Sequence, residues 1–476
     1  MSTYSIQAKK YGEYDVAVCG GGTAGVAAAI AAARGGAKTI LIERTFSVGG
    51  MLTIGEAGIT KFTEHCRDVD KYKSEVLDRL AHDARRVQVA GGIPHEFALR
   101  LIGSGAGLGT HGETGSYVFS DHYLTQLTLF DMLEEAGVTL LLDSHVCGIR
   151  QEGEAIRSIL IHNKEGFSEI DAAQIIDATG DADVAAMAGV PFRRGASEED
   201  IAEGGSERVG QMQSFGTMYR VRGVDFERLF TYLRENPDRF VQHEFGVMSL
   251  DDVIASYRRG DMCVFRVRAD IDGKRRPVQV YNLPARDEAI LLGNWCGMPG
   301  DGLDAASLTR GQITCQRGPM RLTEALRAVP GMERLEILYV PDVGVRETRH
   351  IDGVYRLTGA DVLSGRDFAD SIGCGGHPID IGPLPPELEH VDLNHWRFHI
   401  PFRIMVTKQT RNLLVTGRCV SATRLAFGAL RPTVQCMVMG EAAGTAATLA
   451  VSCGCAAAEV DISRLRELLL QNGAIL

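Results

Sequence analysis

One stretch of this chain, residues 14–51, constrains the fold more than any other. It reads YDVAVCGGGTAGVAAAIAAARGGAKTILIERTFSVGGM, and after its first apolar run Gly20, Gly22 and Gly25 stand in G-x-G-x-x-G spacing. This spacing lets the backbone turn tightly, approach a pyrophosphate and pack the following helix closely on the strand. We therefore expect a buried strand, a glycine turn and a helix over about 25–34, with phosphates at the helix N-terminus.

A second apolar run, residues 39–42, follows the expected helix and ends at Glu43. In dinucleotide-binding proteins an acidic residue about 20 positions beyond the glycines accepts hydrogen bonds from the adenosine ribose. A lone glycine fingerprint is weak evidence, but strand, turn, helix, strand and acid together predict a dinucleotide site. The residues expected at the cofactor here are Gly20, Gly22, Thr23, Ala24, Gly25 and Glu43.

A second glycine turn follows the acid, at residues 44–51. Adjacent glycines let the backbone approach a flat or anionic ligand closely, so this turn is expected to continue the cofactor site. The alternative is a plain loop between a strand and a helix. The candidate residues in the turn are Arg44, Gly49, Gly50 and Met51.

A third region, near the C-terminus, carries a related signal. Residues 412–419 read as a strand, and Pro432 precedes a long apolar helix over about 434–452. Proline is favoured in the first helical turn, and the amides that begin a helix carry partial positive charge. That charge suits a flavin, whose N1 becomes anionic on reduction. Two glycines would let this helix pack closely on the first helix or on the cofactor: Gly440 and Gly444.

These three segments resemble the FAD-dependent oxidoreductases of the glutathione reductase and fumarate reductase-like flavoprotein superfamily, in a branch whose substrates are mostly unassigned. The resemblance covers most of the chain and is weakest over 61–116. It implies that FAD is the cofactor, that Glu43 holds the adenosine ribose, that a backbone group near Val146 meets the adenine, and that the Ala-Thr-Gly-Asp sequence at 178–181 returns to the dinucleotide. The cofactor residues that it adds are Val146, Ala178, Gly180, Asp181, Gly417, Arg418, Thr433 and Val434.

Two details qualify this resemblance. Asp181 has a second interpretation as the N-cap of a helix over 182–189, and one residue can serve both purposes. The strand that ends at Gly417 lacks the Gly-Asp pair that the resemblance implies for aromatic hydroxylases, which disfavours a flavin monooxygenase.

The pattern of expected helices and strands changes near residue 195. Before it, the pattern predicts a helix over 121–137, a strand over 138–142 and an antiparallel meander over 148–170. After it, short strands alternate with helical stretches such as 225–234, without a new glycine fingerprint. This alternation is typical of an antiparallel or mixed sheet inserted into a dinucleotide-binding domain.

We therefore expect an α/β protein. It has a Rossmann-like FAD-binding domain of the three-layer ββα type and an inserted α+β substrate domain on a mixed or antiparallel sheet. The expected FAD-binding domain comprises 1–200 and 405–476, and the inserted domain 201–404. An amphipathic helix is expected over 69–88, and 103–109 is read as a loop rather than a second phosphate site.

The composition narrows the partners. A chain of 476 residues with 45% hydrophobic and 23% charged residues is an ordinary globular composition. Its net charge of −11 argues against nucleic acid and anionic membranes, which bind basic surfaces. A small-molecule substrate is therefore expected, with an unknown electron acceptor, and a homo-oligomeric state stays open.

Two further patterns concern location and metals. Residues 26–33 are too short an apolar run to cross a bilayer, and residues 1–13 are too polar for a signal peptide. The 11 cysteines show no CxxC pair, so neither a metal site nor a disulfide framework is expected. A cytoplasmic protein is the prediction.

Charged residues that could act on a substrate lie in two blocks. The first is GVRETRH at 344–350, where Arg346 and Arg349 can each hold a carboxylate bidentately or meet the flavin. The alternative is that one of them pairs with Glu347 or another nearby acid. The second runs from 374 to 403. In it His395 and His399 have the spacing of a helical metal site, but Pro401 favours an extended chain. General acid or base chemistry is open to histidine near neutral pH. The catalytic candidates are Arg346, Arg349, His377, His399 and Arg403.

The function predicted from these patterns is hydride transfer between a small organic molecule and FAD. Arginines near the substrate would favour an oxygen-rich or carboxylated compound. The alternatives are a flavin that is structural or serves a non-redox addition or elimination, and an NAD(P)H-using flavin reductase. The last is disfavoured because the chain has only one convincing nucleotide fingerprint.

Overall fold

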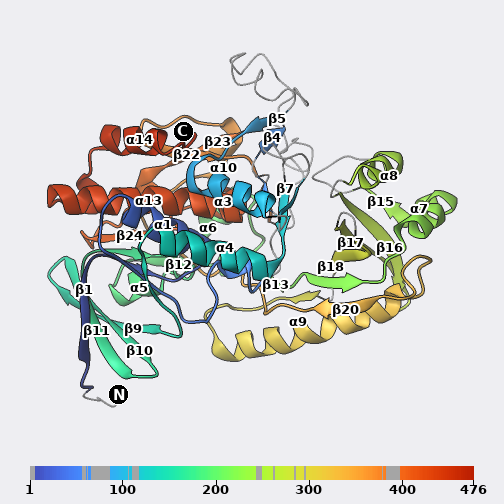
Figure 1. Cartoon of the computed structure of the whole chain (residues 1–476), viewed down its shortest axis with the longest axis horizontal. Helices are drawn as coiled ribbons and strands as arrows, with labels where there is room; N and C mark the ends of the chain where they lie inside the picture. Colours follow the sequence, from blue (N-terminus) through green and yellow to red (C-terminus); the bar gives the residue numbers. More distant parts are fainter. Residues whose placement is uncertain are drawn as a thin grey trace.

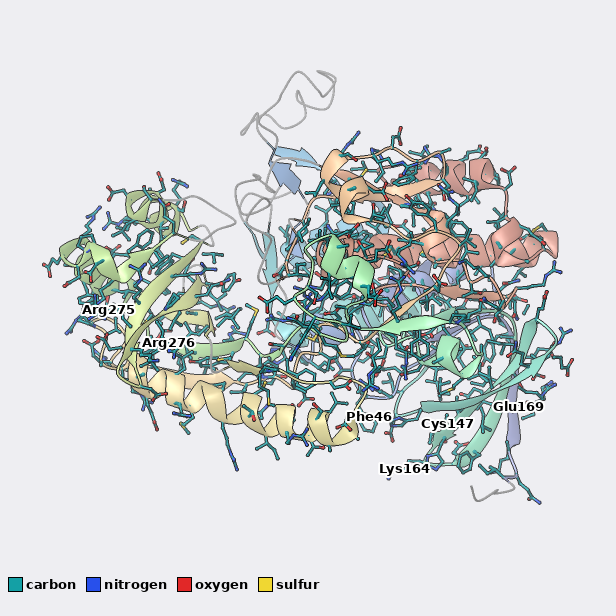
Figure 2. All side chains as sticks on the ribbon, turned by 180° about the vertical axis from the view of Figure 1, so that it is seen from behind. Phe46, Cys147, Lys164, Glu169, Arg275 and Arg276 are labelled. Atoms are coloured by element: carbon teal, nitrogen blue, oxygen red, sulfur yellow. A yellow bond between two sulfur atoms is a disulfide. The ribbon has the colours of Figure 1, made fainter. Side chains whose placement is uncertain are left out.

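The computed structural model of this chain describes residues 6–55, 60–61, 63–65, 86–104, 107–109, 117–242, 249–260, 263–283, 286–293, 296–377, 379–381 and 397–476. Figure 1 shows a larger part, which contains both chain ends, and a smaller part built from the middle of the chain. Figure 2 shows the same division from behind. Arg275 and Arg276 lie in the smaller part, and Cys147 and Glu169 lie at the opposite end of the molecule.

The larger part is organised by one sheet of seven strands. Its order is β8-β2-β1-β11-β10-β9, with β24 paired to the end of β11. β8, β2, β1, β11 and β24 are parallel, whereas β9, β10 and β11 form an antiparallel meander. The strands are β1 (Lys9–Cys19), β2 (Thr39–Ile42), β8 (Thr139–Leu141), β9 (His145–Glu152), β10 (Ala155–Asn163), β11 (Gly166–Asp177) and β24 (Leu413–Val415).

β1 is buried on both faces, as its sequence predicts. Val16 and Val18 belong to the core that contains the helices, whereas Ala17 and Cys19 belong to the core shared with the meander. Continuous apolar sequence is what a central parallel strand requires, because layers cover both of its faces. The predicted α/β fold with a Rossmann-like three-layer domain is confirmed.

Two helices, α1 (Thr23–Arg34) and α13 (Thr433–Cys453), lie side by side on this sheet. A Cβ at Gly440 would overlap the backbone of Ala24, and one at Gly444 would overlap the backbone of Ala28. Contacts therefore advance in the same direction along both helices, so α1 and α13 are parallel and their N-termini lie at the same end. The predicted close packing through these glycines is confirmed.

Two more helices cover α1. Asp121 caps α4 (His122–Glu135), accepting a hydrogen bond from the Tyr123 N–H at 3.0 Å, close to the predicted start. α3 (Gly92–Gly103) contacts α4 and α13 but was not predicted from its glycine-rich sequence. The loop expected over 103–109 includes the end of α3 and a short strand, β6 (Gly107–Gly109). The helix expected over 69–88 falls mostly outside the described residues.

The smaller part is a six-stranded sheet in which all pairs are antiparallel, in the order β15-β16-β17-β18-β14-β20. Three helices cover one face and share a core with it. The strands are β14 (Tyr219–Arg222), β15 (Phe240–Val241), β16 (Val264–Ile271), β17 (Lys274–Asn282), β18 (Glu288–Leu292) and β20 (Glu336–Tyr339); the helices are α7 (Phe226–Glu235), α8 (Leu250–Arg258) and α9 (Ala305–Leu326).

The predicted inserted segment, 201–404, is divided between the two cores. The core of the smaller part draws on residues 219–340. Residues 357–406 contribute instead to the core of α1 and α13, because β22 (Ser371–Gly375) and β23 (Phe398–Pro401) form a hairpin packed on α13. The predicted strand at 398–403 corresponds to β23.

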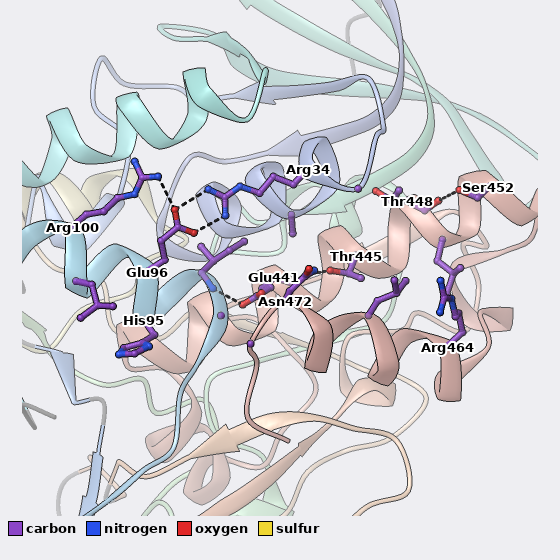
Figure 3. Close-up of a pocket in the computed structure, with 18 residues that line it drawn as sticks. Arg34, His95, Glu96, Arg100, Glu441, Thr445, Thr448, Ser452, Arg464 and Asn472 are labelled. Carbon is purple, nitrogen blue, oxygen red and sulfur yellow. Dashed lines mark hydrogen bonds and ion pairs between the residues drawn. The ribbon is translucent and has the colours of Figure 1, made fainter. Parts of the chain in front are cut away.

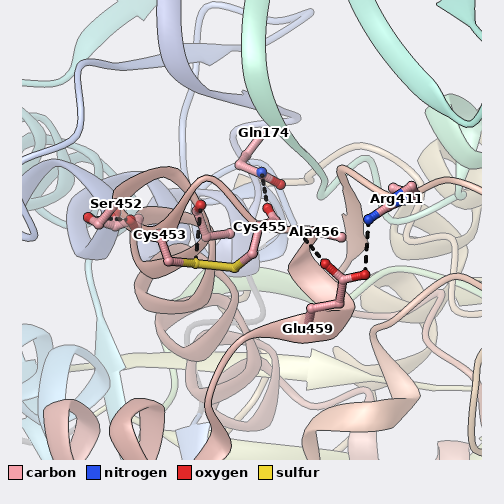
Figure 4. The surroundings of a disulfide bond; sticks show 9 residues. Gln174, Arg411, Ser452, Cys453, Cys455, Ala456 and Glu459 are labelled. Carbon is pink, nitrogen blue, oxygen red and sulfur yellow. Dashed lines mark hydrogen bonds and ion pairs between the residues drawn. A yellow bond between two sulfur atoms is a disulfide. The ribbon is translucent and has the colours of Figure 1, made fainter.

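Among the described helices, one is long and apolar enough to cross a membrane, namely α13, and most of its apolar window is buried inside the protein. Just beyond its C-terminus, a disulfide joins Cys453 and Cys455 (Figure 4). No disulfide was expected here, because one residue separates Cys453 and Cys455, rather than the two residues of a CxxC pair.

Candidate cofactor and active site

The first glycine turn is shaped by close backbone contacts. Gly20 has a φ of +100°, and a Cβ there would lie 2.5 Å from the Ala178 carbonyl oxygen. A Cβ at Gly25 would overlap the Gly20 carbonyl oxygen, whereas one at Gly22 would meet no atom within 4 Å. Gly20 and Gly25 therefore serve the turn itself, and Gly22 leaves open space in front of α1.

The second glycine turn is joined directly to the first. The Gly49 N–H donates to the Gly21 carbonyl oxygen at 2.7 Å, and Gly22 and Gly49 form an isolated bridge. Gly50 has a φ of +54°, and a Cβ there would lie 3.2 Å from the Gly22 Cα. The two turns therefore make one continuous backbone surface, which is the arrangement a dinucleotide requires.

Glu43 closes one side of this surface. Its Oε2 accepts from the Gly21 N–H at 2.7 Å, and its Oε1 accepts from the N–H and the hydroxyl of Thr45 at 2.8 and 2.9 Å. The Ser144 N–H donates to the Glu43 carbonyl oxygen at 3.0 Å, so β9, which carries Val146, starts beside the acid. Arg44 is exposed next to it.

The Ala-Thr-Gly-Asp segment lies against the first turn, where Ala178 contacts Gly20. The interpretation of Asp181 as a helix cap is wrong. α5 (Asp183–Met187) begins after Ala182 without a side-chain cap, and the Asp181 Oδ1 accepts instead from Arg418 at 2.7 Å and from the Thr348 hydroxyl at 2.8 Å. Burial alone would raise the pKa of Asp181, but Arg418 and Thr348 hold that pKa below its ordinary value.

The N-terminus of α13 meets this region from the other side. Pro432 precedes the helix, and no side chain caps its first turn. Gln435 is 1% exposed, yet neither polar atom of its side-chain amide has a partner among the described residues. At the end of β24, the buried Thr416 hydroxyl likewise has no partner there, and Gly417 has a φ of +83° beside Ala24.

α1 also starts without a side-chain cap and without an acidic residue in its first turn. Two bare helix N-termini, two linked glycine turns and buried polar groups without partners all lie at one end of the sheet. Such groups are stabilised by an anionic, hydrogen-bonding ligand. The fold and this surface define a dinucleotide-binding protein, and the residues present fit FAD. The first turn of α1 would hold its pyrophosphate, and the first turn of α13 would face its flavin half.

The chain belongs to the FAD dependent oxidoreductase family, whose profile matches residues 15–469. FAD is accordingly its cofactor. A comparison with curated proteins finds no match.

Several solved structures resemble the chain distantly. One is p-nitrophenol 4-monooxygenase PnpA from Pseudomonas putida, at 12% identity and a TM-score of 0.45, covering 97% of this chain and 86% of that one. Another is a geranylgeranyl bacteriochlorophyll reductase-like protein from Thermoplasma acidophilum, at 13% identity and a TM-score of 0.43, covering 96% and 82%. A flavoprotein/dehydrogenase from Cytophaga hutchinsonii matches at 13% identity and a TM-score of 0.43, covering 96% and 83%.

Of the five predicted catalytic residues, the structure brings together Arg346 and His377. Both lie near Asp380, which forms an ion pair with Arg431. Burial alone would raise the pKa of Asp380, but Arg431, His377 and Arg346 hold that pKa below its ordinary value. Arg431 also donates to the Asp380 carbonyl oxygen at 3.0 Å.

This cluster lies where the two parts of the molecule meet. Gly216 and Gly344 exchange backbone hydrogen bonds of 3.2 and 2.8 Å, and a Cβ at Gly344 would lie 3.1 Å from the Met51 methyl group. Arg346, two residues beyond Gly344, is therefore close to the second glycine turn. Arg431 directly precedes Pro432 at the start of α13. The cluster thus lies between the two cofactor segments.

The other candidates have structural partners elsewhere. The Arg349 Nη1 donates to the Asp183 carboxylate at 2.8 Å and to the Asp181 carbonyl oxygen at 2.7 Å. Arg403 pairs with Asp370 through bonds of 2.8 and 3.1 Å. Arg349 and Arg403 therefore each have a carboxylate partner within the protein, Asp183 and Asp370 respectively.

His399 lies on β23 rather than near Asp380. Its Nδ1 is 3.4 Å from the Ser371 hydroxyl and 3.7 Å from the Cys374 sulfur. Burial and the neighbouring Arg397 lower the pKa of His399. Its possible metal partner, His395, is outside the described residues, and within those residues no three His, Cys, Asp or Glu side chains are grouped to hold a metal.

Glu347 or another nearby acid was the predicted alternative partner of Arg346 or Arg349, and Arg349 does pair with a nearby acid, Asp183. The structure pairs Glu347 with Arg424 instead, at 3.0 Å, and both side chains are fully or almost fully buried. The Gln213 N–H donates to the same carboxylate at 2.7 Å. This ion pair fixes α12 (Arg424–Leu430) against the 344–350 segment. The Glu347 carboxylate is therefore occupied and is not the partner of Arg346.

Sequence reasoning missed Arg431 and Asp380 as site residues. Arg431 directly precedes Pro432, and Asp380 is three residues beyond His377, so both lie close to residues that were predicted. No spacing pattern, however, links positions 380 and 431. The sequence signal that could have indicated Arg431 is its position directly before Pro432, at the start of the uncapped helix α13.

A cavity of about 920 Å³ lies at the other end of α1 and α13, and Figure 3 shows its lining. Glu441 in α13 is 3% exposed and its Oε2 accepts from the Ile93 N–H at 3.0 Å. Burial raises the pKa of Glu441 to about 8. Arg34, Glu96 and Arg100 form an ion-pair network at its edge. None of these groups is near the glycine turns.

Proposed function

We propose that this protein is an oxidoreductase that transfers a hydride between a small organic substrate and FAD. The reaction would be dehydrogenation of a C–H bond or reduction of an activated C=C bond. When bound, the flavin supplies the hydride chemistry. The protein belongs, in this proposal, to the glutathione reductase and fumarate reductase-like superfamily, and it acts in the cytoplasm.

The observation that carries the proposal is the polar cluster of Arg346, Arg431 and Asp380 between the two cofactor segments. A flavin that is only structural needs no charged groups at that position, because burying them is unfavourable unless they bind something. Substrate binding explains their presence. The side chains of this chain would bind and orient the substrate and exclude water from it.

The smaller part supplies the opposite wall in this proposal. On β16 and β17, residues of one face are buried under α7, α8 and α9. The other face carries several half-buried polar side chains, namely Arg266, Arg268, Gln279 and Tyr281. Tyr281 is on this polar face and close enough to Arg346 to influence its pKa. A substrate between flavin and sheet would therefore meet polar groups.

Anaerobic mixing of the holoprotein with candidate substrates tests this function. Loss of the visible absorbance of oxidised flavin, with conversion of substrate, is the expected result. Turnover with the flavin remaining oxidised would instead favour the non-redox alternative. Rapid bleaching by NADH or NADPH alone would favour a flavin reductase.

A further inference from the structure

The cluster of Arg346, Arg431 and Asp380 contains two cationic side chains and one carboxylate. It lies between the second glycine turn and the N-terminus of α13. Arg431 has a carboxylate partner, Asp380. Within the described parts of the chain, the guanidinium of Arg346 has neither a hydrogen bond nor an ion pair. The nearest carboxylate in sequence, Glu347, is taken by Arg424. Within the described residues, Arg346 therefore has no ion-pair partner of its own, and the nearby Asp380 is already bound by Arg431.

The Arg346 guanidinium packs closely against the backbone of Gly216. A Cβ at Gly216 would lie 3.0 Å from Nη2 and 3.4 Å from Cζ of Arg346. Glycine at 216 thus leaves room for the guanidinium plane against the strand. The bridge between Gly216 and Gly344 fixes the backbone on both sides.

This position is unfavourable for an isolated cation. Burial, and secondly the neighbouring Arg431, lower the pKa of Arg346. A guanidinium nevertheless stays protonated in proteins, so the charge persists and favours an anion at its open donors. A carboxylate matches those donors geometrically, because its two oxygens accept two parallel N–H bonds.

The charge count also limits what can bind. Asp380 already neutralises Arg431, and its carboxylate would repel the second negative charge of a phosphate. One uncompensated cation beside one carboxylate suits a monoanion.

We propose that Arg346, with Arg431 and Asp380 beside it, forms the subsite for a carboxylate group of the substrate. This inference rests on the proposed function, since it assigns the substrate of the same site. Arg346 is the residue that contacts the carboxylate, Asp380 positions Arg431, and Gly216 makes room for the Arg346 guanidinium.

The test uses the holoprotein and small anions that fit any carboxylate subsite. Its melting temperature is measured against increasing acetate or benzoate, with acetamide, benzamide and sodium chloride at matched ionic strength as references. Binding to the native state raises the melting temperature saturably. Saturable stabilisation by the carboxylates and none by the amides is expected. Phosphate that stabilises as well as acetate would overturn the choice of a monoanion.

Variants assign the effect to Arg346. Arg346→Gln is expected to weaken acetate binding at least about tenfold, and Arg346→Lys to retain part of it, because a lysine keeps the charge but not the bidentate geometry. Arg222→Gln is the matched control, since Arg222 is an exposed arginine of the inserted sheet, paired with Glu336. Equal acetate dependence in wild type and Arg346→Gln would sink the proposal, as would the absence of carboxylate stabilisation in the wild type.

Two further outcomes separate this inference from the proposed function. Carboxylate binding that requires Arg346, in a protein whose flavin no substrate reduces, keeps the subsite and removes hydride transfer. Equal flavin reduction by a carboxylated substrate in wild type and Arg346→Gln, at the same concentrations, keeps hydride transfer and removes the subsite. A changed flavin reduction potential in Arg346→Gln with unchanged acetate binding assigns Arg346 to the flavin and also removes the subsite.

Discussion

The parallel helices α1 and α13 have two common ends, and these are built differently. At the N-terminal end neither helix has a side-chain cap, and the buried amide of Gln435 has no partner in the described structure. At the C-terminal end several polar groups have partners. The Cys455 N–H closes the last turn of α13, the Thr448 hydroxyl donates to the Ala32 carbonyl oxygen at 3.1 Å, and Arg34 pairs with Glu96.

Side-chain caps are present on several other described helices, although α3, α5 and α12 also begin without one. α4, α7, α8, α9 and α14 (Ile462–Gln471) all begin with an Asp or Ser whose side chain accepts from the first turn. Such caps stabilise a helix by about 1 kcal/mol each. The chain omits them where α1 and α13 meet the glycine turns. We therefore propose that FAD binds at the end of the helix pair where α1 and α13 lack side-chain caps.

The largest expected effect follows from blocking that end. Gly22→Val places a side chain where no protein atom lies within 4 Å, so the apoprotein should fold normally. FAD affinity should fall at least about 100-fold, which corresponds to roughly 2.7 kcal/mol. Flavin absorbance after gel filtration and the melting temperature of the apoprotein measure the two effects.

Gly103→Val is the matched control, because position 103 also has open space but lies at the end of α3. It should keep its flavin. A yellow Gly22→Val protein with wild-type FAD affinity would show that the pyrophosphate does not approach the first turn.

A smaller loss is expected for Glu43→Gln. The Glu43 carboxylate accepts from Gly21 and Thr45, and a glutamine amide must turn one N–H toward these donors. Removing a hydrogen bond to a charged group costs about 1.5–3 kcal/mol, so FAD affinity should fall roughly 10- to 100-fold. Fluorescence titration of the apoprotein with FAD measures this affinity.

Glu96→Gln makes the same chemical change at the other end. Glu96 pairs with Arg34 and Arg100 on a partly exposed surface, where such pairs contribute at most about 1 kcal/mol. Its FAD affinity should equal that of the wild type. Equal losses in the two variants would contradict the assignment of one end to the cofactor.

Between the two ends, Glu441 predicts a dependence of stability on pH. Its pKa is raised from 4.5 to about 8 in the native state, so between these values the native state holds a proton that the unfolded state has lost. Raising the pH through this window therefore favours unfolding, by up to about 1.4 kcal/mol per pH unit.

Glu441→Gln should remove this dependence, because a glutamine keeps an acceptor for the Ile93 N–H without ionising. The free energy of unfolding, measured in urea from pH 5.5 to 8.5 for both proteins, gives the difference. A difference that grows with pH in favour of the variant is expected. Parallel pH profiles would show that Glu441 does not hold its proton in the native state.

The features of the two helix ends that depend on residues close in sequence were predicted correctly. The second strand was predicted at 39–42 and forms there, because a continuous run of apolar residues is typical of a buried parallel strand. The α1–α13 contact was also predicted, because Gly440 and Gly444 record it in their spacing. Uncapped starts can be read in the same way, from the residues before each helix.

What failed depends on contacts between distant segments. α3 begins at Gly92 because the Glu441 carboxylate, far along the chain, satisfies the Ile93 N–H, and no local signal announces that. Arg431 and Asp380 meet only after α12 packs on residues 379–381, where the Asp380 N–H donates to the Gly428 carbonyl oxygen at 3.2 Å. The histidines and arginines predicted for catalysis were chosen by residue type, and their partners, such as Asp370 for Arg403, decided where they lie.

The smallest effect is expected at the far C-terminal end, where the disulfide Cys453–Cys455 follows α13 (Figure 4). Cross-linking stabilises a protein less as the closed loop shortens, and for a loop this short we expect at most about 2 kcal/mol. The Cys453→Ser/Cys455→Ser double variant should therefore melt slightly earlier than the wild type and retain its FAD. This follows because the last turn of α13 is also closed by Gly454, which has a φ of +62° and donates to the Val451 carbonyl oxygen at 3.2 Å. Thiol titration before and after reduction checks that the bond exists, and flavin absorbance checks the cofactor. Loss of FAD when the disulfide is reduced would contradict the comparison most directly. It would show that the C-terminal end of the helix pair affects cofactor binding at the N-terminal end.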